Sequence, residues 1–378
     1  MIPDEIIVFE ILVRLPVKAL MRFRSVSKAW RAIISDPFFI RLHLQQSAKD
    51  QKHFPSFLIT PHTLYKVINS EIWPTTFSNH IPFYSWQEGR DNACLVHSSN
   101  FQGEFGSVYP MVQCDGLVVL PTNTTVYVFN PATHDVLKLP NGQKDEWSFP
   151  TIGLGLDPLT RKYKVARFFC SSLIFKNQAY SVRMEMFTIC GDHDTGSCWR
   201  STVEDPPFSI LPGAVTYFKG SLYSQIWSKL VELPPQGFHR FDLEDETFSF
   251  IWLDLIELGG ELCLAQCLVE QIVVWMLRSH DGRDWVQQYV ISLPEASNFG
   301  AFCVLPKDVM LVRSGSCLYH YVDACQFARE TVCLDRLRYK NSRGDSFDFV
   351  GQDVFFFDIF PYTESLVPVT KGRQQLQA

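Results

Sequence analysis

The residue types that could carry chemistry in this chain lie in a few short stretches. Gly153-Leu154-Gly155 has the first two glycines of a dinucleotide-binding loop, but Asp157-Pro158 follows where such a loop needs a helix start and a third glycine. The chain has no G-x-x-x-x-G-K-S/T phosphate loop and no G-x-S-x-G nucleophile motif. The glycine stretch therefore predicts a turn between two strands, not a cofactor site.

Potential metal ligands are poorly spaced for a structural zinc site. Cys190, His193 and Cys198 lie within nine residues, but no second pair at zinc spacing accompanies them. Cys263 and Cys267 are four residues apart in an apolar stretch, which favours packing over metal binding. We therefore expect no metal and no cofactor.

The acidic pairs and the cysteines do not indicate a reaction either. Asp192/Asp194 and Asp345/Asp348 lie in turn-like segments that contain glycine, so we expect solvated turn residues. The chain has eleven cysteines, an odd number, and they are scattered over 378 residues. Without a secretory leader, this pattern favours reduced thiols that pack as small hydrophobic side chains. The sequence predicts a protein that is not an enzyme.

Length and composition indicate a folded chain of two or three units. Charged residues make up 20%, aromatic residues 14%, and the mean hydropathy is −0.01. No window approaches the roughly 18 apolar residues of a membrane span, and Asp4, Glu5 and Glu10 interrupt any secretory apolar region. The net charge of −6 and the pI of 5.9 argue against nucleic acid as a partner. We expect no membrane partner and a location in the cytoplasm or nucleus.

The first 47 residues differ from the rest of the chain in charge and in apolar content. They carry seven basic and four acidic side chains, and 26 of them are apolar, against 46% for the whole chain. The basic excess is either an ordinary solvated helix face or a surface that favours an acidic protein partner.

Capping residues divide this segment into three or four short helices. Pro3, followed by two acids, begins the first helix, and Pro16 ends it and begins a second over 16–24. Ser27 caps a third helix that runs to about Ile34. The chain then restarts into a short helix that carries Phe38, Phe39, Leu42 and Leu44. About 45 residues of helix cannot bury this apolar surface alone, so it must meet a larger domain or a helical partner protein.

The same segment resembles an F-box of the plant type. The similarity rests on four stretches in the family's order and spacing: Ile2-Pro3-Asp4-Glu5-Ile6-Ile7, Leu15-Pro16-Val17-Lys18, Arg22-Phe23-Arg24-Ser25-Val26-Ser27-Lys28-Ala29-Trp30-Arg31 and Ile34-Ser35-Asp36-Pro37. The family's F-box docks on the Skp-type adaptor of a cullin-based (SCF) ubiquitin ligase. The resemblance implies an adaptor-facing surface, or its support, made of Pro3, Ile6, Leu15, Pro16, Leu20, Val26 and Trp30. Trp30 could equally be a buried strut between the helices.

From about residue 54 the pattern changes to short β-rich runs between turn residues. The clear runs are Gly116–Leu120, Val126–Phe129, Lys164–Phe169, Met184–Ile189, Phe248–Trp252 and Gln271–Leu277. A strand-turn-strand pattern recurs at 129–139 and 241–251, and the stretches after Lys219 and Gly259 look like the starts of further sheets. About 320 residues of short strands exceed an ordinary sandwich and favour a propeller.

This region resembles the plant F-box-associated interaction domain, which is kelch-like in outline. The similarity rests on Cys114-Asp115-Gly116-Leu117, Asn130-Pro131-Ala132-Thr133, Gly153-Leu154-Gly155-Leu156-Asp157-Pro158, Tyr163-Lys164-Val165, Trp199-Arg200, Gly220-Ser221-Leu222-Tyr223, Phe241-Asp242-Leu243 and Tyr362-Thr363-Glu364-Ser365-Leu366-Val367. A propeller must close its ring, and we predict that Ser346–Ile359 pairs with the strand near Phe57–Ile59. The expected α+β organisation is an F-box over 1–47, a divergent connection with the first strands over 48–110, a propeller-like domain over 111–369 and a disordered tail over 370–378.

Together the two resemblances imply a non-catalytic substrate receptor of an SCF-type ubiquitin ligase. The F-box would hold the Skp-type adaptor and through it the cullin, while the β domain would bind the target protein. Phe38, Phe39 and Leu42 are expected to pack on the β domain as a stiff coupling. Two alternatives remain open at this point: an adaptor-bound scaffold that does not degrade its partner, and a propeller that binds a small molecule or a sugar.

Overall fold

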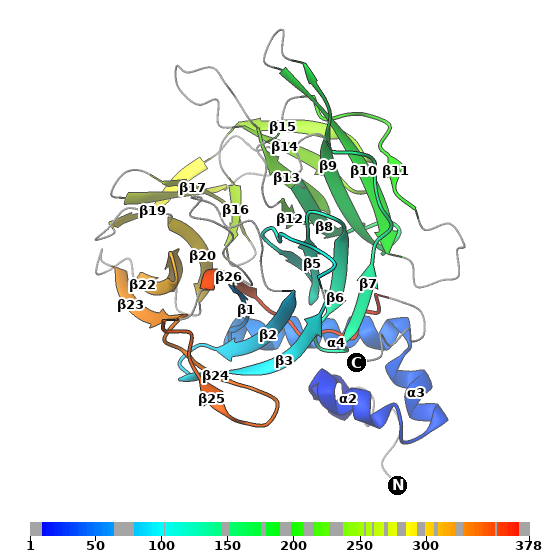
Figure 1. Cartoon of the computed structure of the whole chain (residues 1–378), viewed down its shortest axis with the longest axis vertical. Coiled ribbons are helices and arrows are strands. Elements are labelled where there is room, and N and C mark those ends of the chain that lie inside the picture. Colours follow the sequence, from blue (N-terminus) through cyan, green and yellow to red (C-terminus); the bar gives the residue numbers. More distant parts are fainter. Residues whose placement is uncertain are drawn as a thin grey trace.

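A helical block at the N-terminus joins a mainly-β domain, as the ribbon of the computed structural model shows (Figure 1). The structure describes residues 10–63, 79–101, 103–145, 151–174, 179–189, 198–207, 210, 215–226, 237–252, 255–258, 261–267, 271–277, 285–292, 299–305, 309–321, 328–351 and 354–369. The predicted tail over 370–378 and the acidic pair Asp192/Asp194 lie outside the described residues. Among the described residues, no helix has both the length and the apolar character that crossing a membrane requires.

The helical block contains the 3-10 helix η2 (Leu12–Arg14) and the α-helices α2 (Val17–Phe23), α3 (Lys28–Ile34) and α4 (Pro37–His53). The predicted cap at Ser27 is confirmed, since its side chain accepts a hydrogen bond from the Trp30 backbone N–H at 3.1 Å. Asp36 caps α4 in the same way, accepting from the backbone N–H of Phe38 at 2.7 Å. The prediction of a short last helix is wrong, because α4 has 17 residues and continues past residue 47.

In the part of the chain that the structure describes, the strands form five four-stranded sheets and one six-stranded sheet. The first two are β4 (Val112–Cys114), β5 (Leu117–Pro121), β6 (Val126–Asn130), β7 (Asp135–Lys138), and β8 (Thr151–Leu156), β9 (Tyr163–Ile174), β10 (Ala179–Ile189), β11 (Arg200–Ser201). The third and fourth are β12 (Thr216–Phe218), β13 (Ser221–Gln225), β14 (Gly237–Asp242), β15 (Phe248–Trp252), and β16 (Leu255–Leu258), β17 (Glu261–Cys267), β18 (Gln271–Leu277), β19 (Trp285–Ser292). The fifth is β20 (Phe299–Leu305), β21 (Val309–Ser314), β22 (Cys317–Tyr321), β23 (Ala328–Cys333).

The six-stranded sheet combines the two ends of the β domain and is called the closing sheet below. Its order is β25-β24-β3-β2-β1-β26, from β1 (Ser56–Thr63), β2 (His80–Gln87), β3 (Asn92–Asn100), β24 (Arg338–Lys340), β25 (Ser346–Phe347) and β26 (Val354–Pro361). The predicted ring closure is confirmed for β26, which pairs antiparallel with β1 and places Ile359 opposite Ile59. Ser346 and Phe347 pair with β24 instead.

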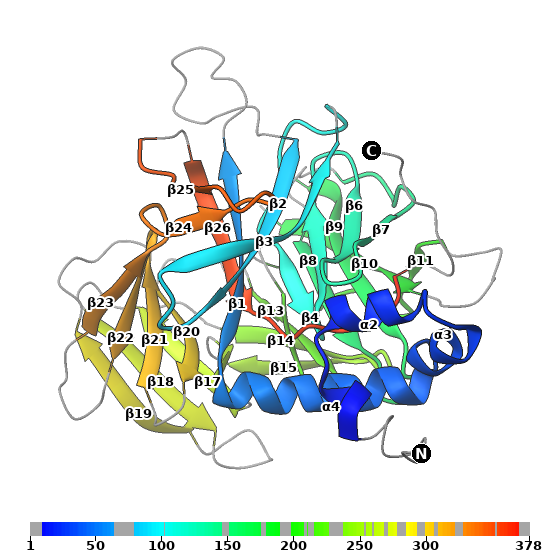
Figure 2. The same ribbon diagram turned by 90° about the horizontal axis from the view of Figure 1, so that it is seen from below.

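The sheets follow one another around the domain in a propeller-like arrangement (Figures 1 and 2). The first strands of successive four-stranded sheets contact one another, from β4 to β8, β12, β16 and β20. Side chains from facing sheets form the core, so that β5 and β6 are buried on both faces. This two-sided burial explains why these strands are continuous apolar runs without a polar alternation.

Three expectations about the β domain need correction. Gly153 and Gly155 lie inside β8 and not in a turn. Glycine fits there because a Cβ at Gly155 would lie 2.4 Å from the Tyr217 ring of the next sheet. The stretches Ser221–Gln225 and Glu261–Cys267 are second strands of their sheets, since β12 and β16 precede them. Cys317 and Cys333 form a disulfide, which differs from the expectation of reduced thiols.

Candidate functional site

The face of the helical block that points toward the β domain is a buried apolar cluster, called the inner face below. Its members share almost complete burial and come from both parts of the chain: Leu12, Val13, Val17, Leu20, Ile34, Phe39 and Leu366. Trp30, Leu42 and Ala132 pack against the same cluster. The inner face therefore joins the F-box-like helices, the turn after β6 and the C-terminal segment into one core.

Residues 362–369, called the C-terminal strap below, connect this cluster to the propeller. Leu366 lies in the inner-face cluster, while Val367 and Val369 lie in the core between the β4–β7 and β8–β11 sheets. Ile40 and Leu44 of α4 pack against that second core from the helical side. Because α4 and the strap both contact both cores, the helical block is packed on the propeller and is not attached by a bare linker.

Polar contacts complete the junction between the helices and the strap. The backbone N–H of Val17 donates to Glu364 Oε2 at 3.1 Å, which satisfies a donor in the first turn of α2. His43 Nε2 lies 2.9 Å from the carbonyl oxygen of Leu15, and burial lowers the pKa of His43 below its ordinary value. A neutral imidazole with its proton on Nε2 donates this hydrogen bond.

Two of the sequence motifs, those of Asn130 and Gly116, contact the backbone of the strap directly. The Asn130 side chain donates from Nδ2 to the carbonyl oxygens of Ser365, at 3.0 Å, and Val367, at 2.8 Å. Its Oδ1 accepts from the backbone of Ala132 at 3.0 Å, which forms the turn after β6. Gly116 has a φ of +80°, and a Cβ there would lie 2.4 Å from the Thr363 carbonyl oxygen. Both motifs therefore fix the strap, and through it the helices.

The motif that ends in Asp157 takes part in a network of ion pairs elsewhere in the propeller. Lys164 Nζ lies 2.8 Å from Asp157 and 3.0 Å from Glu246, and Arg200 pairs with the same Glu246. Burial alone would raise the pKa of Asp157, but hydrogen bonds from Lys164, Thr160 and nearby backbone N–H groups bring it down to about 2. These ion pairs join the β8–β11 sheet to the β12–β15 sheet, so we assign them a role in stability.

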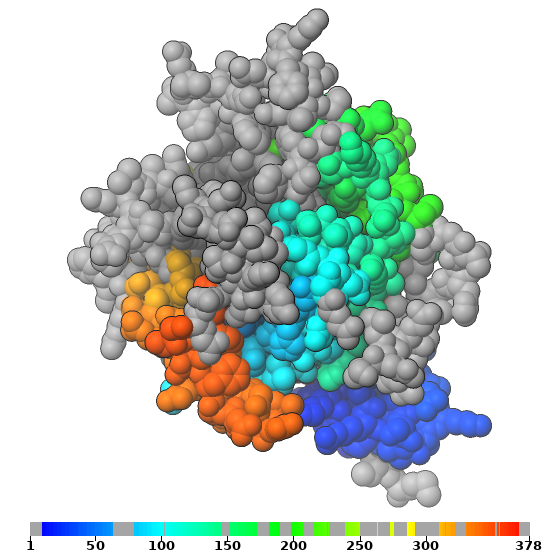
Figure 3. All heavy atoms as spheres, viewed as in Figure 1, coloured from blue at the N-terminus to red at the C-terminus, as the bar shows by residue number. Residues whose placement is uncertain are grey.

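The helical block also carries exposed apolar side chains, which together are called the outer face below. Val26 is 68% exposed and Phe38 is 56% exposed, and Ile11 is also exposed. The guanidinium carbon of Arg41 lies 6.0 Å from the centre of the Phe38 ring. The expected coupling to the β domain is confirmed for Phe39 and Leu42, which pack in the cluster that contains Leu366. It is wrong for Phe38, whose side chain is mostly exposed. Figure 3 shows the helical block protruding at one edge of the molecule.

The predicted adaptor-facing residues divide between the two faces. Val26 and Pro16 are exposed, Leu15 and Trp30 are half-buried, and Leu20 is fully buried on the inner face. Trp30 packs edge-on against Phe23, with ring centres 5.0 Å apart, and keeps part of its surface exposed. Pro3 and Ile6 lie outside the described residues. Leu20 can therefore serve only as support for a docking surface.

An open cleft of about 280 Å³ lies where the helices, the closing sheet and the strap meet. Its titratable lining residues are Arg14, His43, Asp50, Tyr362 and Glu364. Two of these already have partners inside the junction, since His43 contacts Leu15 and Glu364 accepts from Val17. The cleft brings together no nucleophile with an activating base among the described residues that line it.

Comparisons with known proteins match both parts of the chain. Residues 1–42 match the F-box domain, and residues 73–314 match the F-box associated beta propeller domain. Two F-box proteins of Arabidopsis thaliana are 33% and 32% identical over 290 and 292 residues, in each case covering 73% of this chain and 68% of the relative. A third F-box protein of the same organism is 26% identical over 352 residues, which cover 82% of this chain and 75% of the relative.

Proposed function

This chain belongs to the plant F-box proteins that carry an F-box associated beta propeller domain, and from that premise we propose that it is a substrate receptor of an SCF-type ubiquitin ligase. F-box domains generally bind Skp-type adaptors. In this proposal the outer face docks on the adaptor, and through it on a cullin, while the propeller binds a target protein. Such a receptor would work in the cytoplasm or the nucleus.

The observation that carries the proposal is the division of the helical block into two faces. The inner face is already occupied by Leu366 and the strap, so it is not available to a partner. Val26 and Phe38 remain exposed on the same short block. Apolar side chains held on the surface by a rigid support are suited to protein docking, because little conformational freedom is lost when a partner covers them.

The role of the receptor in ubiquitin transfer would be positional. A target held by the propeller reaches the conjugating enzyme only if the propeller keeps a defined orientation relative to the adaptor. The contacts of α4 with the propeller core, through Ile40 and Leu44, and those of the strap supply that stiffness. The propeller would contribute no reacting group and would raise the local concentration of target lysines.

Co-purification with a Skp-type adaptor tests the docking surface. We expect the wild type to form a stoichiometric complex, and Val26→Asp/Phe38→Asp to lose it, because a charge on each exposed apolar side chain opposes burial. Val203→Asp is the matched control, since Val203 is 93% exposed on the propeller. All three proteins should unfold at the same temperature. A wild type that stays monomeric beside the adaptor would refute the proposal.

A second measurement separates a degrading receptor from a passive scaffold. The complex is mixed with a cullin, ubiquitin and the activating and conjugating enzymes, and ubiquitin attached to the receptor itself is followed by gel mobility. We expect modification of the wild type and of Val203→Asp, and none of the outer-face double variant. Adaptor binding without any modification would favour a non-degradative scaffold.

A further inference from the structure

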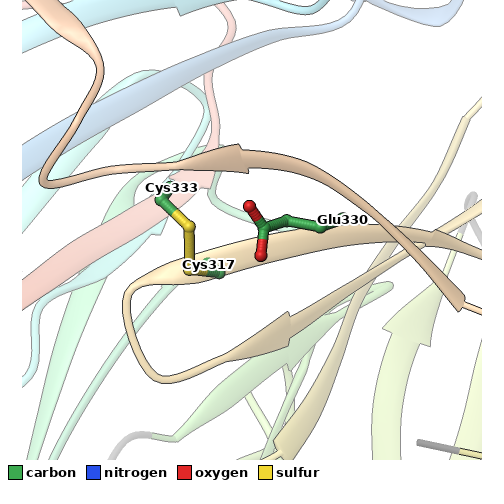
Figure 4. A group of neighbouring side chains, drawn as sticks. All are labelled: Cys317, Glu330 and Cys333. Atoms are coloured by element: carbon green, nitrogen blue, oxygen red, sulfur yellow. A yellow bond between two sulfur atoms is a disulfide. The ribbon is translucent and has the colours of Figure 1, made fainter. Parts of the chain in front are cut away.

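The edge of the β20–β23 sheet carries a cluster that the proposed function does not use. Cys317 is the first residue of β22 and lies opposite Cys333, the last residue of β23, with 4.1 Å between their Cα atoms. The two sulfur atoms form a disulfide. Glu330 of β23 is the third member, and its carboxylate turns toward the two sulfur atoms (Figure 4).

An irregularity in the strand pairing brings Glu330 to this face. Leu318 pairs with Val332, but the next residue, Tyr319, pairs with Glu330, so Thr331 is an extra residue in β23. In a regular strand Thr331 would share the face of Cys333, because side chains alternate. The bulge moves Glu330 onto that face instead. As a result, the ligand atoms of Cys317, Glu330 and Cys333 all lie within 4.8 Å of one another.

We propose that Cys317, Cys333 and Glu330 form a redox-gated zinc site. In the oxidised form the sulfur atoms are bonded to each other and cannot bind a metal. A dithiol reductant breaks the S–S bond by supplying two electrons and two protons, and is itself oxidised to a disulfide. Each Cys317 and Cys333 thiol then releases its proton to solvent as its sulfur binds Zn²⁺, and the ionised Glu330 supplies an oxygen ligand.

The geometry and the chemistry of the three side chains suit this metal. Zinc takes thiolate and carboxylate ligands in a tetrahedral arrangement, in which two sulfur atoms lie about 3.8 Å apart at ordinary Zn–S lengths. Paired positions on adjacent strands allow that separation by side-chain rotation alone. Glu330 is exposed and Cys333 is only 7% exposed, so the site is open to solvent on one side, where water would complete the coordination.

The position of the cluster connects it to ring closure. Cys333 is followed by Leu334, whose backbone N–H donates to the Ser316 carbonyl oxygen at 2.8 Å. Leu334 and Leu337 pack in the core between the β20–β23 sheet and the closing sheet. A zinc ion that joins the ends of β22 and β23 would therefore stabilise this core in a reduced protein, as the disulfide does in an oxidised one.

Zinc titration of the full chain in complex with its adaptor, or alone if no complex forms, tests the site. The protein is reduced, freed of reductant under anaerobic conditions and titrated with Zn²⁺ against a chromophoric chelator. We expect one more bound zinc in the wild type than in Cys317→Ser/Cys333→Ser, which controls for the other cysteines. The oxidised wild type should match the double variant. Equal zinc content in the reduced wild type and the double variant would overturn the proposal.

Two further variants test the ligand set. Glu330→Gln should weaken zinc binding by more than the roughly 10–100-fold that loss of a supporting residue typically costs. Glu244→Gln, which changes an exposed carboxylate beside another sheet, is the matched control and should bind zinc as the wild type does. Cobalt bound to the reduced wild type should show thiolate charge-transfer absorption that is weaker in Cys333→Ser and absent from Cys317→Ser/Cys333→Ser. Full affinity in Glu330→Gln would overturn the three-ligand site.

Discussion

The inner and outer faces of the F-box helices have similar apolar composition but opposite environments. Leu20 on α2 is fully buried against residues that include Leu366, whereas Val26, six residues later, is 68% exposed. Phe39 and Phe38 repeat the contrast at adjacent positions of α4. Apolar content alone therefore does not identify a docking surface. Within this block, the surface available to a partner is the part that the chain itself does not cover.

The contrast also explains why the strap is essential to the junction. Without Leu366, the inner face would expose apolar surface just as the outer face does. Asn130, Gly116 and Glu364 hold the strap in place by hydrogen bonds and by close packing. Substitutions on the inner face and around the strap should therefore change stability, while substitutions on the outer face should change partner binding.

The largest expected effect is that of Leu20→Ala. Removing a fully buried leucine side chain should lower the free energy of unfolding of the helical block by about 3–5 kcal/mol. Thermal unfolding, with limited proteolysis to locate the weakened region, measures this loss. Val26→Ala is the matched control and should unfold like the wild type while binding the adaptor more weakly. Equal destabilisation by both substitutions would remove the distinction between the faces.

Asn130→Ala should have the next largest effect. It leaves two strap carbonyl groups, of Ser365 and Val367, without their buried donor and removes the acceptor of the turn after β6. We expect a loss of about 2–3 kcal/mol in the free energy of unfolding, measured by urea denaturation. Asn123→Ala, which removes the acceptor of two exposed backbone N–H groups, of Gly106 and Ser107, is the control. A stable Asn130→Ala would show that apolar packing alone holds the strap.

Acid should affect the propeller at Asp157, which lies away from the junction. Its pKa is lowered to about 2 in the folded protein, so its contribution is present above its ordinary pKa and is lost as the pH falls from about 4 to about 2. A shift of this size corresponds to about 2 kcal/mol. Urea denaturation across this range measures it. Asp157→Asn should be less stable at neutral pH and should lack this part of the pH dependence.

The elements that sequence reasoning predicted correctly depend on local chemistry. The cap at Ser27, and the hairpin turns after Phe129 and Phe241, follow from side chains that bond to their own neighbouring backbone. The pairing of β1 with β26 was predictable because a propeller ring must close. The family resemblance supplied the order of the two domains.

The features that sequence reasoning missed depend on contacts between distant residues. Asn130 reaches Ser365 across 235 positions, and Val17 reaches Glu364 across 347, and one sequence contains no signal for either contact. The polar end of α4 after residue 47 lacks apolar periodicity, so the helix was predicted too short. Phe38 and Phe39 are identical side chains at adjacent positions. Which one is buried depends on the side of α4 that packs on the rest of the protein, and this is a tertiary contact.

The smallest expected effect is that of Glu364→Gln at the junction. The amide oxygen can still accept from the Val17 N–H, so we expect the free energy of unfolding to fall by at most about 1 kcal/mol at neutral pH.

The same substitution should change the pH dependence of stability through His43. Burial lowers the pKa of His43, whereas the charge of Glu364 acts to raise it, so removing that charge should lower the pKa further. Because its pKa is lower in the folded protein, His43 takes up a proton more readily in the unfolded protein. The free energy of unfolding should therefore fall as the pH drops below about 6.5. The fall should be steeper in Glu364→Gln than in the wild type, and thermal unfolding between pH 8 and 5 would show it. Parallel pH profiles would mean that Glu364 acts on α2 alone and does not influence His43.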